Sequence, residues 1–431
     1  MTDRPLTQNI IGFDGHTDLA RYEGNGGYQA VRKTIGRTEP AEVLEVIKDA
    51  NLRGRGGAGF PTGMKWSFVP AKKDDEGHRY LIANADEMEP GTFKDRLLLE
   101  RDPHQLIEGM ILSAYTIEAD VGYIFIRAEY HVAIARLRDA IAAAESANLL
   151  GDNILDSGYN FSLYVHISAG RYICGEETAL LNSLEGKRAI PRAKPPFPQV
   201  SGLWGRPTIV NNVETLCNVT HIIANGADWF KSLGLGKDGG TKLFGASGRV
   251  KQPGCWELPM GTSIREILQD HAGGMADGYQ LKGFLPGGAS TDFLIEEHLE
   301  LPMEYEAVME AGSRMGTGTM IILDDRACPV GMIANLEKFF ARESCGFCTP
   351  CREGTGWLYR VLTRITEGQG VEADLDMLLD VANKIEGHTI CALGDAAAWP
   401  VQSFLKHFHY EFKYMIEHAG CSIVDGVSTA A

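Results

Sequence analysis

The chain has 431 residues, of which 44% are hydrophobic and 23% are charged, a composition typical of a water-soluble protein with several domains. Its formal net charge of −16 argues against non-specific nucleic-acid binding, which requires a basic surface. No stretch is apolar and long enough to predict direct membrane insertion, and residues 1–8 lack the pattern of a secretory signal. The nine cysteines are interpreted as reduced thiols and ligands, which indicates a reducing compartment such as the cytoplasm.

The first part of the chain is polar and rich in glycine, and residues 1–38 predict an extended arm with little core of its own. A helix is predicted over Pro40–Asn51, where apolar residues share one side. The glycine-rich run Gly54–Gly63 follows this helix rather than a strand, so it does not fit the ordinary dinucleotide-binding fingerprint. Its backbone N–H groups nevertheless suit a phosphate or a flat ring, and Arg55 and Lys65 add positive charge; a flexible surface loop is the alternative.

Three buried strands are predicted next, at residues 79–83, 122–127 and 161–168. Helical patterns at 103–119 and 130–147 separate them. Strands that alternate with helices indicate βαβ crossovers and a parallel sheet. Ligands of such sheets bind beyond the carboxyl ends of the strands.

Two acidic segments follow predicted strand ends, Asn84–Glu89 after the first strand and Cys174–Glu177 after the third. We expect both to open onto one cleft. Their carboxylates suit ribose hydroxyls and disfavour the additional phosphate of NADP, although solvated surface turns are the commoner fate of acidic residues. A basic, proline-rich loop at 187–198 and the segment Val210–Thr215, which opens another helix, follow.

The composition shifts near Gly239, and short strand-like segments at Leu243–Ala246 and Met320–Leu323 predict a small β-rich domain. Four helical patterns then recur at 332–342, 351–367, 373–385 and 394–417, which predicts a helical bundle. The predicted organisation is an N-terminal arm at 1–38, an α/β domain at 39–239, a β-rich domain at 240–330, a helical bundle at 331–420 and a loose tail at 421–431.

The most specific motif is the cysteine triplet Cys345, Cys348 and Cys351, which Cys391 follows downstream. Three cysteines at two-residue gaps place three thiolates on one [4Fe–4S] cluster, and Cys391 is the candidate for the fourth ligand. Zinc is the alternative, but structural zinc sites usually bring cysteines in pairs. The remaining cysteines lack ligand spacing and are interpreted as small buried hydrophobic side chains: Cys174, Cys217, Cys255, Cys328 and Cys421.

Five motifs in this order give the chain a close resemblance to a known family: Gly54–Gly63, Asn84–Gly91, Cys174–Thr178, Val210–Thr215 and Glu343–Cys351. From about residue 28 to 415 the chain resembles the flavoprotein (F) subunits of bacterial NADH–quinone oxidoreductase, respiratory complex I. That resemblance implies an α/β plus α architecture. Its parts are a Rossmann-like FMN domain with a parallel sheet, a ubiquitin-like β-grasp domain, and a C-terminal helical bundle with one [4Fe–4S] cluster.

The resemblance also implies the site residues. Non-covalent FMN is expected against Gly54, Arg55, Gly56, Lys65, Asn84, Asp86, Glu87, Tyr172, Gly175, Glu176, Asn211, Asn212 and Thr215. NADH is expected to meet Gly57, Ala58, Phe60, Phe68, Glu89, Glu177, Lys194 and Phe197. The implied cluster ligands are Cys345, Cys348, Cys351 and Cys391.

The implied function is electron input: a hydride passes from NADH to FMN, and single electrons then pass to the [4Fe–4S] cluster and on to partner clusters toward quinone. No side chain is expected to act as a covalent catalyst, and Glu177 is hypothesised to select NADH over NADPH. The implied partners are the [2Fe–2S]-bearing (E) subunit and the large iron–sulfur (G) subunit of complex I. They would place the chain in the cytoplasm, peripheral to the inner face of the bacterial plasma membrane.

Two alternatives remain open from the sequence. One is the diaphorase subunit of an NAD-linked hydrogenase or formate dehydrogenase, whose members often carry additional cysteine-rich segments. The other is a non-catalytic interaction protein in which a metal ion only stabilises the fold.

Overall fold

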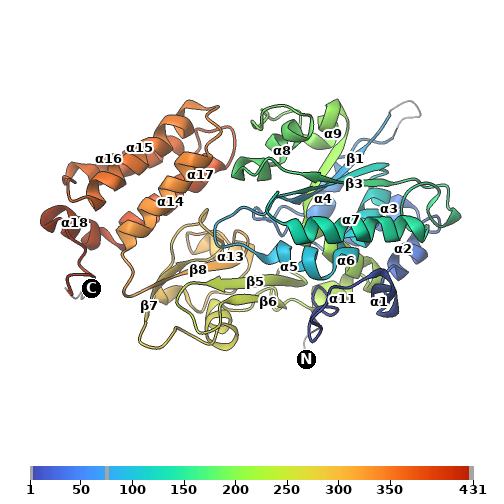
Figure 1. Cartoon of the computed structure of the whole chain (residues 1–431), viewed down its shortest axis with the longest axis horizontal. Helices are drawn as coiled ribbons and strands as arrows, with labels where there is room; N and C mark the ends of the chain where they lie inside the picture. The colour runs from blue at the N-terminus through green and yellow to red at the C-terminus, as the bar shows by residue number, and fades with distance from the viewer. Residues whose placement is uncertain (1–2, 73–76, 427–431) are drawn as a thin grey trace. The chain divides into compact units, whose positions relative to one another are not determined.

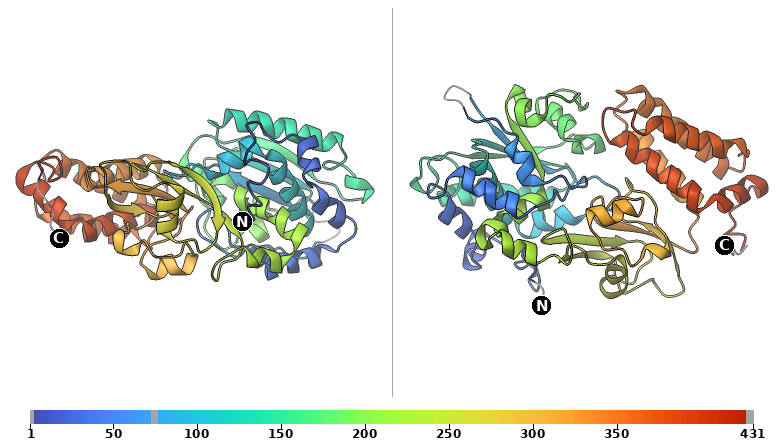
Figure 2. Two further views of the ribbon diagram at one scale, coloured as in Figure 1. Left: turned by 90° about the horizontal axis from the view of Figure 1, so that it is seen from below. Right: turned by 180° about the vertical axis from the view of Figure 1, so that it is seen from behind.

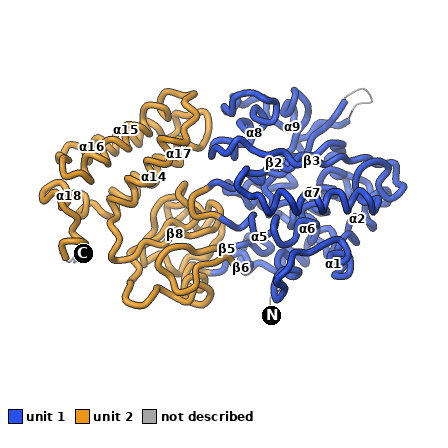
Figure 3. The backbone as a smooth tube through the Cα atoms, viewed as in Figure 1, with its two compact units in different colours: residues 1–88, 93–244, 256–262 blue, residues 89–92, 245–255, 263–431 orange. Residues whose placement is uncertain are grey.

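The computed structural model describes residues 3–72 and 77–426 (Figure 1). By its internal contacts the chain divides into two compact units, which Figure 3 colours separately. The first unit contains Met1–Met88, Phe93–Phe244 and Trp256–Thr262, and the second contains Glu89–Thr92, Gly245–Cys255 and Ser263–Ala431.

Residues 3–38 do not form the extended arm that the sequence predicted, because they carry two helices and part of the core. These helices are α1 (Leu19–Gly24) and α2 (Gln29–Thr34). Tyr22 and Tyr28 are buried, and the Tyr22 hydroxyl and the Tyr28 N–H donate to the Glu108 carboxylate at 2.7 and 2.9 Å. Polar and glycine residues outnumber the apolar ones here, and this composition led to the wrong prediction. Two buried tyrosines are enough to anchor the segment to the core.

Within the described residues, the sheet of the first unit has four parallel strands in the order β3-β2-β1-β4. The strands are β1 (Tyr80–Ala85), β2 (Val121–Ile126), β3 (Ser162–Ile167) and β4 (Thr208–Asn212). The three predicted strands are therefore confirmed to within two residues. The fourth, β4, was not predicted, because it is short and ends in two asparagines.

Helices cover both faces of this sheet (Figures 1 and 2). Leu180 and Leu181 of α8 pack with Tyr80 and Ile82 of β1, whereas α6 and α10 pack on the other face of β1. The helices of this unit after α2 are α3 (Pro40–Asp49), α4 (Thr62–Ser67), α5 (Lys94–Arg101), α6 (Pro103–Thr116), α7 (His131–Ser146), α8 (Glu177–Leu184), α9 (Pro198–Ser201), α10 (Val213–Asn225) and α11 (Ala227–Ser232).

A second sheet in the described chain has the order β6-β5-β8-β7, with β5 and β8 parallel and β7 and β8 antiparallel. Its strands are β5 (Thr241–Ser247), β6 (Gly254–Pro259), β7 (Leu281–Leu285) and β8 (Thr319–Asp324), and the boundary between the units falls within β5 and β6. The short strands predicted at 243–246 and 320–323 are confirmed. The short helices α12 (Ile264–Glu266) and α13 (Tyr305–Glu310) lie between the strands in sequence.

The predicted helical bundle is confirmed in the second unit, where successive helices from α14 to α17 pack on one another. Its helices are α14 (Pro329–Glu343), α15 (Thr349–Thr366), α16 (Ala373–Ile385), α17 (Leu393–His407) and α18 (His409–His418). The single helix predicted at 394–417 is instead α17 and α18. The break lies at Phe408, which has φ −123° and ψ 30° and packs its buried ring on Phe293 and Phe404.

No helix in residues 3–72 and 77–426 has the length and hydropathy that crossing a lipid bilayer requires. The tail predicted to be loose lies outside the described residues from position 427 onward, whereas residues 422–426 form a turn.

Candidate functional site

The glycine-rich run joins α3 to α4 and lies against the start of α10. Gly57 and Gly59 have φ of +146° and +66°, conformations that favour glycine. A Cβ atom at Gly56 would lie only 3.0 Å from the Cβ of Asn212, and the Arg55 N–H donates to the Thr215 hydroxyl at 2.8 Å. The run therefore presents closely packed backbone beside β4, which suits a ligand that approaches the main chain.

The Arg55 side chain is not directed toward a ligand at the glycine-rich run. It is fully buried, and its Nη2 donates to the carbonyls of Gly239 and Thr241 at 3.0 and 3.2 Å. The sequence suggested that Arg55 adds positive charge to the glycine-rich run. In the folded protein its contribution there is restricted to the backbone, because the guanidinium stabilises the chain that leads into β5.

The two predicted acidic segments do meet beyond the strand ends. The Asn84 side chain at the end of β1 donates to the Gly175 carbonyl at 2.8 Å. The Glu176 carboxylate caps α8 by accepting from the N–H groups of Thr178 and Ala179, both at 2.8 Å. Tyr172 lies in the preceding short helix Tyr172–Gly175. The two segments thus meet at one edge of the sheet, whereas the expectation that they open onto one cleft stays a prediction.

Glu177 lies between two lysines at the first turn of α8. Its carboxylate oxygens accept from Lys65 at 2.8 Å and from Lys194 at 2.6 Å. Burial raises the pKa of Glu177, but Lys65 and Lys194 outweigh this and lower the pKa to about 2. Lys65 also donates to the Val210 carbonyl at 2.9 Å, which ties this cluster to β4. Glu177 is therefore an oriented, ionised carboxylate at neutral pH.

Three predicted aromatic residues of the first unit are exposed rather than packed into the core. Phe60, Phe68 and Phe197 are 49%, 52% and 52% exposed, and the rings of Phe60 and Phe68 lie 6.5 Å apart. Phe60 belongs to the glycine-rich run, Phe68 ends α4, and Phe197 precedes α9. Exposed aromatic faces of this kind are available to stack on a flat ring.

A buried charge network supports this region, and the sequence reasoning missed it. Lys94 contacts Asp95 at 2.7 Å and Glu214 at 2.8 Å, and Lys242 contacts Glu214 at 3.1 Å. All four side chains are at most 3% exposed. The network also fixes the side chain of Asn212, a predicted site residue, which donates to Asp95 at 2.6 Å and accepts from Lys94 at 3.2 Å.

The electrostatics of the network explain how it tolerates burial. Burial raises the pKa of Glu214, but Lys242 and Lys94 lower it to about 2. Burial lowers the pKa of Lys242 to about 8 against the opposing effect of Glu214. Glu214 stands inside the quoted motif Val210–Thr215, and Lys94 and Asp95 follow the motif that ends at Gly91. The position of these charged residues within or beside the motifs was the one signal in the sequence that could have identified the network.

Glu87 is buried next to this network and contacts the start of α5. It accepts from the Asp95 N–H and from the Tyr130 hydroxyl, both at 2.8 Å. Burial, with a further contribution from Asp95, raises the pKa of Glu87 to about 7. The adjacent Glu89 belongs to the second unit, where its carboxylate accepts from the Ser290 N–H at 2.7 Å and the Ser290 hydroxyl at 2.9 Å.

The cysteine triplet lies in the second unit at the junction of α14 and α15. Cys345 follows α14, Cys348 caps α15, and Cys351 lies in the first turn of α15. The Cys351 sulfur is hydrogen-bonded to the Ser344 hydroxyl at 3.1 Å. Burial raises the pKa of Cys351 to about 11; Ser344 lowers it, and the neighbouring Cys348 and Cys345 raise it. Cys391 lies in the turn before α17.

The chemistry of these donors fits an iron–sulfur cluster. Thiolates are its normal ligands, and a cubane distributes four of them over separate corners. In the described part of the chain no three His, Cys, Asp or Glu side chains converge on a single metal ion. The positive φ of Gly346, +77°, allows the tight turn between Cys345 and Cys348.

The other cysteines only partly match their predicted burial. Cys174 and Cys217 are buried, as predicted. Cys255, Cys328 and Cys421 are partly exposed, so the prediction was wrong for them. Each lies at or beyond the end of a helix or strand, where the chain reaches the surface.

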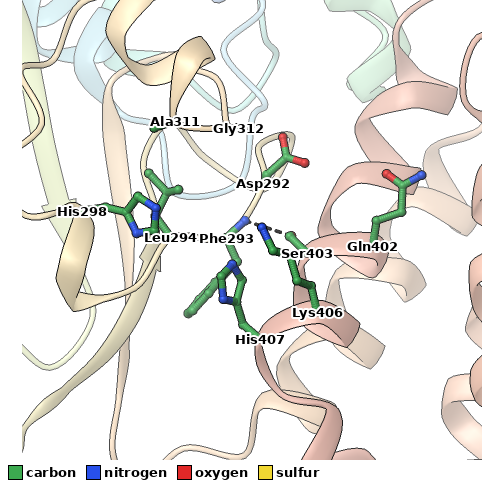
Figure 4. Close-up of a pocket in the computed structure, with 10 residues that line it drawn as sticks. All are labelled: Asp292, Phe293, Leu294, His298, Ala311, Gly312, Gln402, Ser403, Lys406 and His407. Atoms are coloured by element: carbon green, nitrogen blue, oxygen red, sulfur yellow. Dashed lines mark hydrogen bonds between the residues drawn. The ribbon is translucent and has the colours of Figure 1, made fainter.

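A separate pocket of about 170 Å³ lies in the second unit (Figure 4). Asp292, His298 and Lys406 are among its lining residues, and the Phe293 N–H donates to Ser403 at 2.9 Å beside it. It contains none of the residues predicted to bind FMN, NADH or the cluster.

Three stretches of the chain match models of known protein families. Residues 47–221 match the family model of the Nuo51 FMN-binding domain, residues 245–293 match the SLBB domain, and residues 331–415 match the NADH-ubiquinone oxidoreductase-F iron-sulfur binding region. These matches agree with the α/β region, the second sheet and the helical bundle of the structure.

Full-length relatives agree with the family models. The proteins named as the F subunit of NADH-quinone oxidoreductase in Salmonella typhimurium and Escherichia coli are each 53% identical, over 98% of this chain and 96% of theirs. The protein named as the second F subunit of that enzyme in Rhizobium meliloti is 51% identical over 98% of this chain and 99% of its own. A crystal structure of NAD+-reducing [NiFe]-hydrogenase in the H2-reduced state matches with a TM-score of 0.82 and 37% identity. The match covers 93% of this chain and 67% of that one.

Proposed function

The chain belongs to the F-subunit family of NADH-quinone oxidoreductase, and from this premise we propose which of its residues carry the activity and which chains surround it. As a member, it is an oxidoreductase subunit that oxidises NADH and passes electrons to iron–sulfur clusters, with FMN and a [4Fe–4S] cluster as cofactors. Bound FMN supplies the exchange between hydride and single-electron chemistry, which no side chain provides. The residues of the chain bind and orient FMN and NADH and select the nucleotide.

We propose that the FMN-binding site lies where the glycine-rich run meets the carboxyl ends of β1 and β4. The observation that carries this proposal is the tight seating of Gly56 against Asn212, with Asn84 bonded to Gly175 at the neighbouring strand end. Arg55 would contribute through its backbone, because its guanidinium is occupied elsewhere. The proposed set is Gly54, Arg55, Gly56, Lys65, Asn84, Asp86, Glu87, Tyr172, Gly175, Glu176, Asn211, Asn212 and Thr215.

For NADH we propose the exposed aromatic residues and the lysine-bound carboxylate of the first unit. Phe60, Phe68 and Phe197 offer faces for flat rings, and the ionised Glu177 offers an acceptor for a ribose hydroxyl. Its negative charge would repel the 2′-phosphate of NADPH. The proposed set is Gly57, Ala58, Phe60, Phe68, Glu89, Glu177, Lys194 and Phe197.

For the [4Fe–4S] cluster we propose Cys345, Cys348, Cys351 and Cys391 as ligands. The position of the first three cysteines on the short turn between α14 and α15 supports this assignment. Cys391 completes the thiolate set that such a cluster requires, and it lies in the same helical region of the second unit.

The chain is part of a multi-subunit NADH-quinone oxidoreductase, as the names of its relatives indicate. We propose the [2Fe–2S]-bearing (E) subunit and the large iron–sulfur (G) subunit as its neighbours, and a cytoplasmic position at the inner face of the plasma membrane through them. Co-purification of both neighbours with a tagged chain, in the membrane fraction of its source, tests this. Recovery of the chain without either would contradict it.

Cofactor analysis of the purified chain tests the assignment as a whole. We expect FMN to be released on denaturation, together with iron and acid-labile sulfide. A chain that bound zinc and no flavin, even after reconstitution with FMN, iron and sulfide under anaerobic conditions, would instead support a protein in which the metal only stabilises the fold. The diaphorase alternative is less favoured, because the chain is 51–53% identical to the F-subunit relatives and 37% identical to the matching hydrogenase chain.

A further inference from the structure

The pocket of about 170 Å³ in the second unit is lined by residues that the proposed function does not use (Figure 4). Its volume corresponds to roughly six water molecules, which is too small for a nucleotide or a flavin and suits a smaller molecule. The end of α17 forms one wall, and the segment from Asp292 to the short helix Glu296–His298 forms another. Both walls belong to the second unit, so the pocket is a feature of that unit alone.

Three basic side chains line this pocket: Lys406, His407 and His298. Figure 4 shows Lys406 and His407 extending from α17 toward Phe293 and Leu294, which His298 approaches from the other side. Among the residues that the structure describes, no side-chain hydrogen bond or ion pair engages the Lys406 ammonium or the His407 ring. Both groups are therefore available to a ligand in the pocket.

The third basic group, His298, is only loosely paired. Its Nε2 lies 3.9 Å from the Glu297 carboxylate, beyond hydrogen-bond distance, and that carboxylate is 71% exposed. Burial lowers the pKa of His407, and the charges of Lys406 and His298 lower it further against the effect of Glu297. Lys406 and His407 also complement the dipole at the end of α17, but this does not account for His298, which comes from a different segment.

Negative charge at the pocket is compensated by other residues. Among the described residues that line it, the only carboxylate is Asp292, which forms an ion pair with Arg314. The Gln402 amide nitrogen is also occupied, because it donates to Asn383 and Glu386, both at 2.9 Å. The uncompensated charge that faces the pocket is thus positive, which favours an anion.

The wall between the basic groups is apolar and fixed in place. Phe293 and Leu294 are buried, at 1% and 2% exposed. The Phe293 N–H donates to the Ser403 hydroxyl at 2.9 Å, and its ring packs on Phe404 with the ring centroids 4.6 Å apart. Because α17 itself holds this wall, the pocket is formed before a ligand arrives, which lowers the cost of binding.

We propose that this pocket binds a small organic carboxylate, with its acid group at the three basic side chains and its short hydrocarbon part against Phe293 and Leu294. The Lys406 ammonium supplies a charge-assisted hydrogen bond to the carboxylate, and His407 and His298 supply ring N–H donors. The ligand thereby joins α17 to the segment that precedes α13. Since it binds only the folded protein, it also stabilises the second unit.

Isothermal titration calorimetry of the full, cofactor-loaded protein tests the proposal with succinate, a small dicarboxylate, and with succinamide, which has the same shape without the charge. We expect saturable binding of succinate at a single site and no binding of succinamide at the same concentration. Phosphate, which has no apolar part, should bind more weakly than succinate. Absence of succinate binding, or equal binding of succinamide, would overturn the proposal. Tighter binding of phosphate would overturn the assignment to a carboxylate.

Two matched lysine variants locate the site. Lys406→Met should weaken succinate binding by about tenfold or more, because a hydrogen bond to a charged group is lost. Lys413→Met changes another exposed lysine of the second unit, which lies near Glu372 and Glu417, and should leave binding unchanged. Both lysines are exposed, so both variants should fold, and melting curves check this. Equal affinity of Lys406→Met and the unchanged protein would place succinate elsewhere and overturn the proposal.

Discussion

The proposed FMN residues of the first unit and the proposed cluster cysteines of the second are held in place by different means. In the first unit, Asn212 is bonded to Asp95 and Lys94, which belong to a buried network of opposite charges. In the second unit, the triplet lies on a loop and a helix start, with the Ser344 hydroxyl beside Cys351.

This difference indicates where each site obtains its order. The proposed flavin region is organised by ion pairs within the chain, so its geometry is part of the fold of the first unit. The cluster region gathers thiols whose arrangement metal–thiolate bonds would complete. A change in the network should therefore damage the fold and the flavin together, whereas a change in the triplet should remove the cluster and leave the flavin.

The largest expected effect is complete loss of the cluster in Cys348→Ala, because a cubane normally needs four thiolates. FMN should remain, since the proposed flavin residues belong to the first unit. Iron, acid-labile sulfide and FMN are measured in the purified variant, with Cys255→Ala as the control that keeps all three. Unchanged iron content would refute Cys348 as a ligand, and joint loss of FMN would refute the independence of the two sites.

The next largest effect is expected for Lys94→Met. Removing one member of a buried charge network costs about 3–5 kcal/mol, because Glu214 and Asp95 keep their charges with fewer partners. The melting temperature of the first unit should fall, and FMN should bind about tenfold more weakly, because Asn212 loses one of its contacts. Lys384→Met removes an exposed lysine paired with Asp380 and is the control. Equal stability of both variants would contradict the structural role of the network.

A smaller effect is expected for nucleotide choice in Glu177→Gln. Loss of the carboxylate charge should raise the kcat/KM ratio of NADPH to NADH by roughly tenfold, about 1.4 kcal/mol of discrimination. Glu129→Gln changes an exposed carboxylate paired with Arg127 and should leave the ratio as it was. Steady-state kinetics with NADH and with NADPH measure this ratio. An unchanged ratio in Glu177→Gln would contradict the proposed role of Glu177 in selecting NADH.

The smallest effect concerns the pH dependence of the first unit. Glu87 has a folded pKa of about 7, above its ordinary 4.5, so the folded chain retains a proton that the unfolded chain has released. Its stabilising contribution is complete below about pH 4.5 and is lost as the pH rises toward 7, on the order of 1–3 kcal/mol in all.

Melting curves of the unchanged protein and of Glu87→Gln between pH 4.5 and 7.5 measure this contribution. The difference between them should vary with pH across that window and become constant above it. A difference that does not change with pH would show that Glu87 ionises normally in the folded chain.

Local patterns were enough to predict most of the architecture. Apolar runs located β1, β2 and β3, and 3.6-residue periodicity located α14, α15 and α16, because these elements bury one face or two along a continuous stretch. Glycine density and cysteine spacing likewise identified the run at 54–63 and the triplet, since both motifs are local in sequence.

Features made by distant residues were missed. The ion pairs from Lys94 and Lys242 to Glu214 join α5, β5 and α10, and each residue alone resembles an ordinary surface charge. The Arg55 guanidinium was expected at the ligand because nothing local reveals the carbonyls of Gly239 and Thr241.

The central claim is that the chain binds FMN and a [4Fe–4S] cluster and oxidises NADH. Anaerobic optical spectra of the purified chain, recorded before and after addition of NADH or, separately, of NADPH, test it most directly. A flavin band that NADH bleaches and NADPH changes little, above broad iron–sulfur absorption, is the predicted result. A protein that remains colourless after reconstitution with FMN, iron and sulfide, or whose flavin NADH does not reduce, would contradict it.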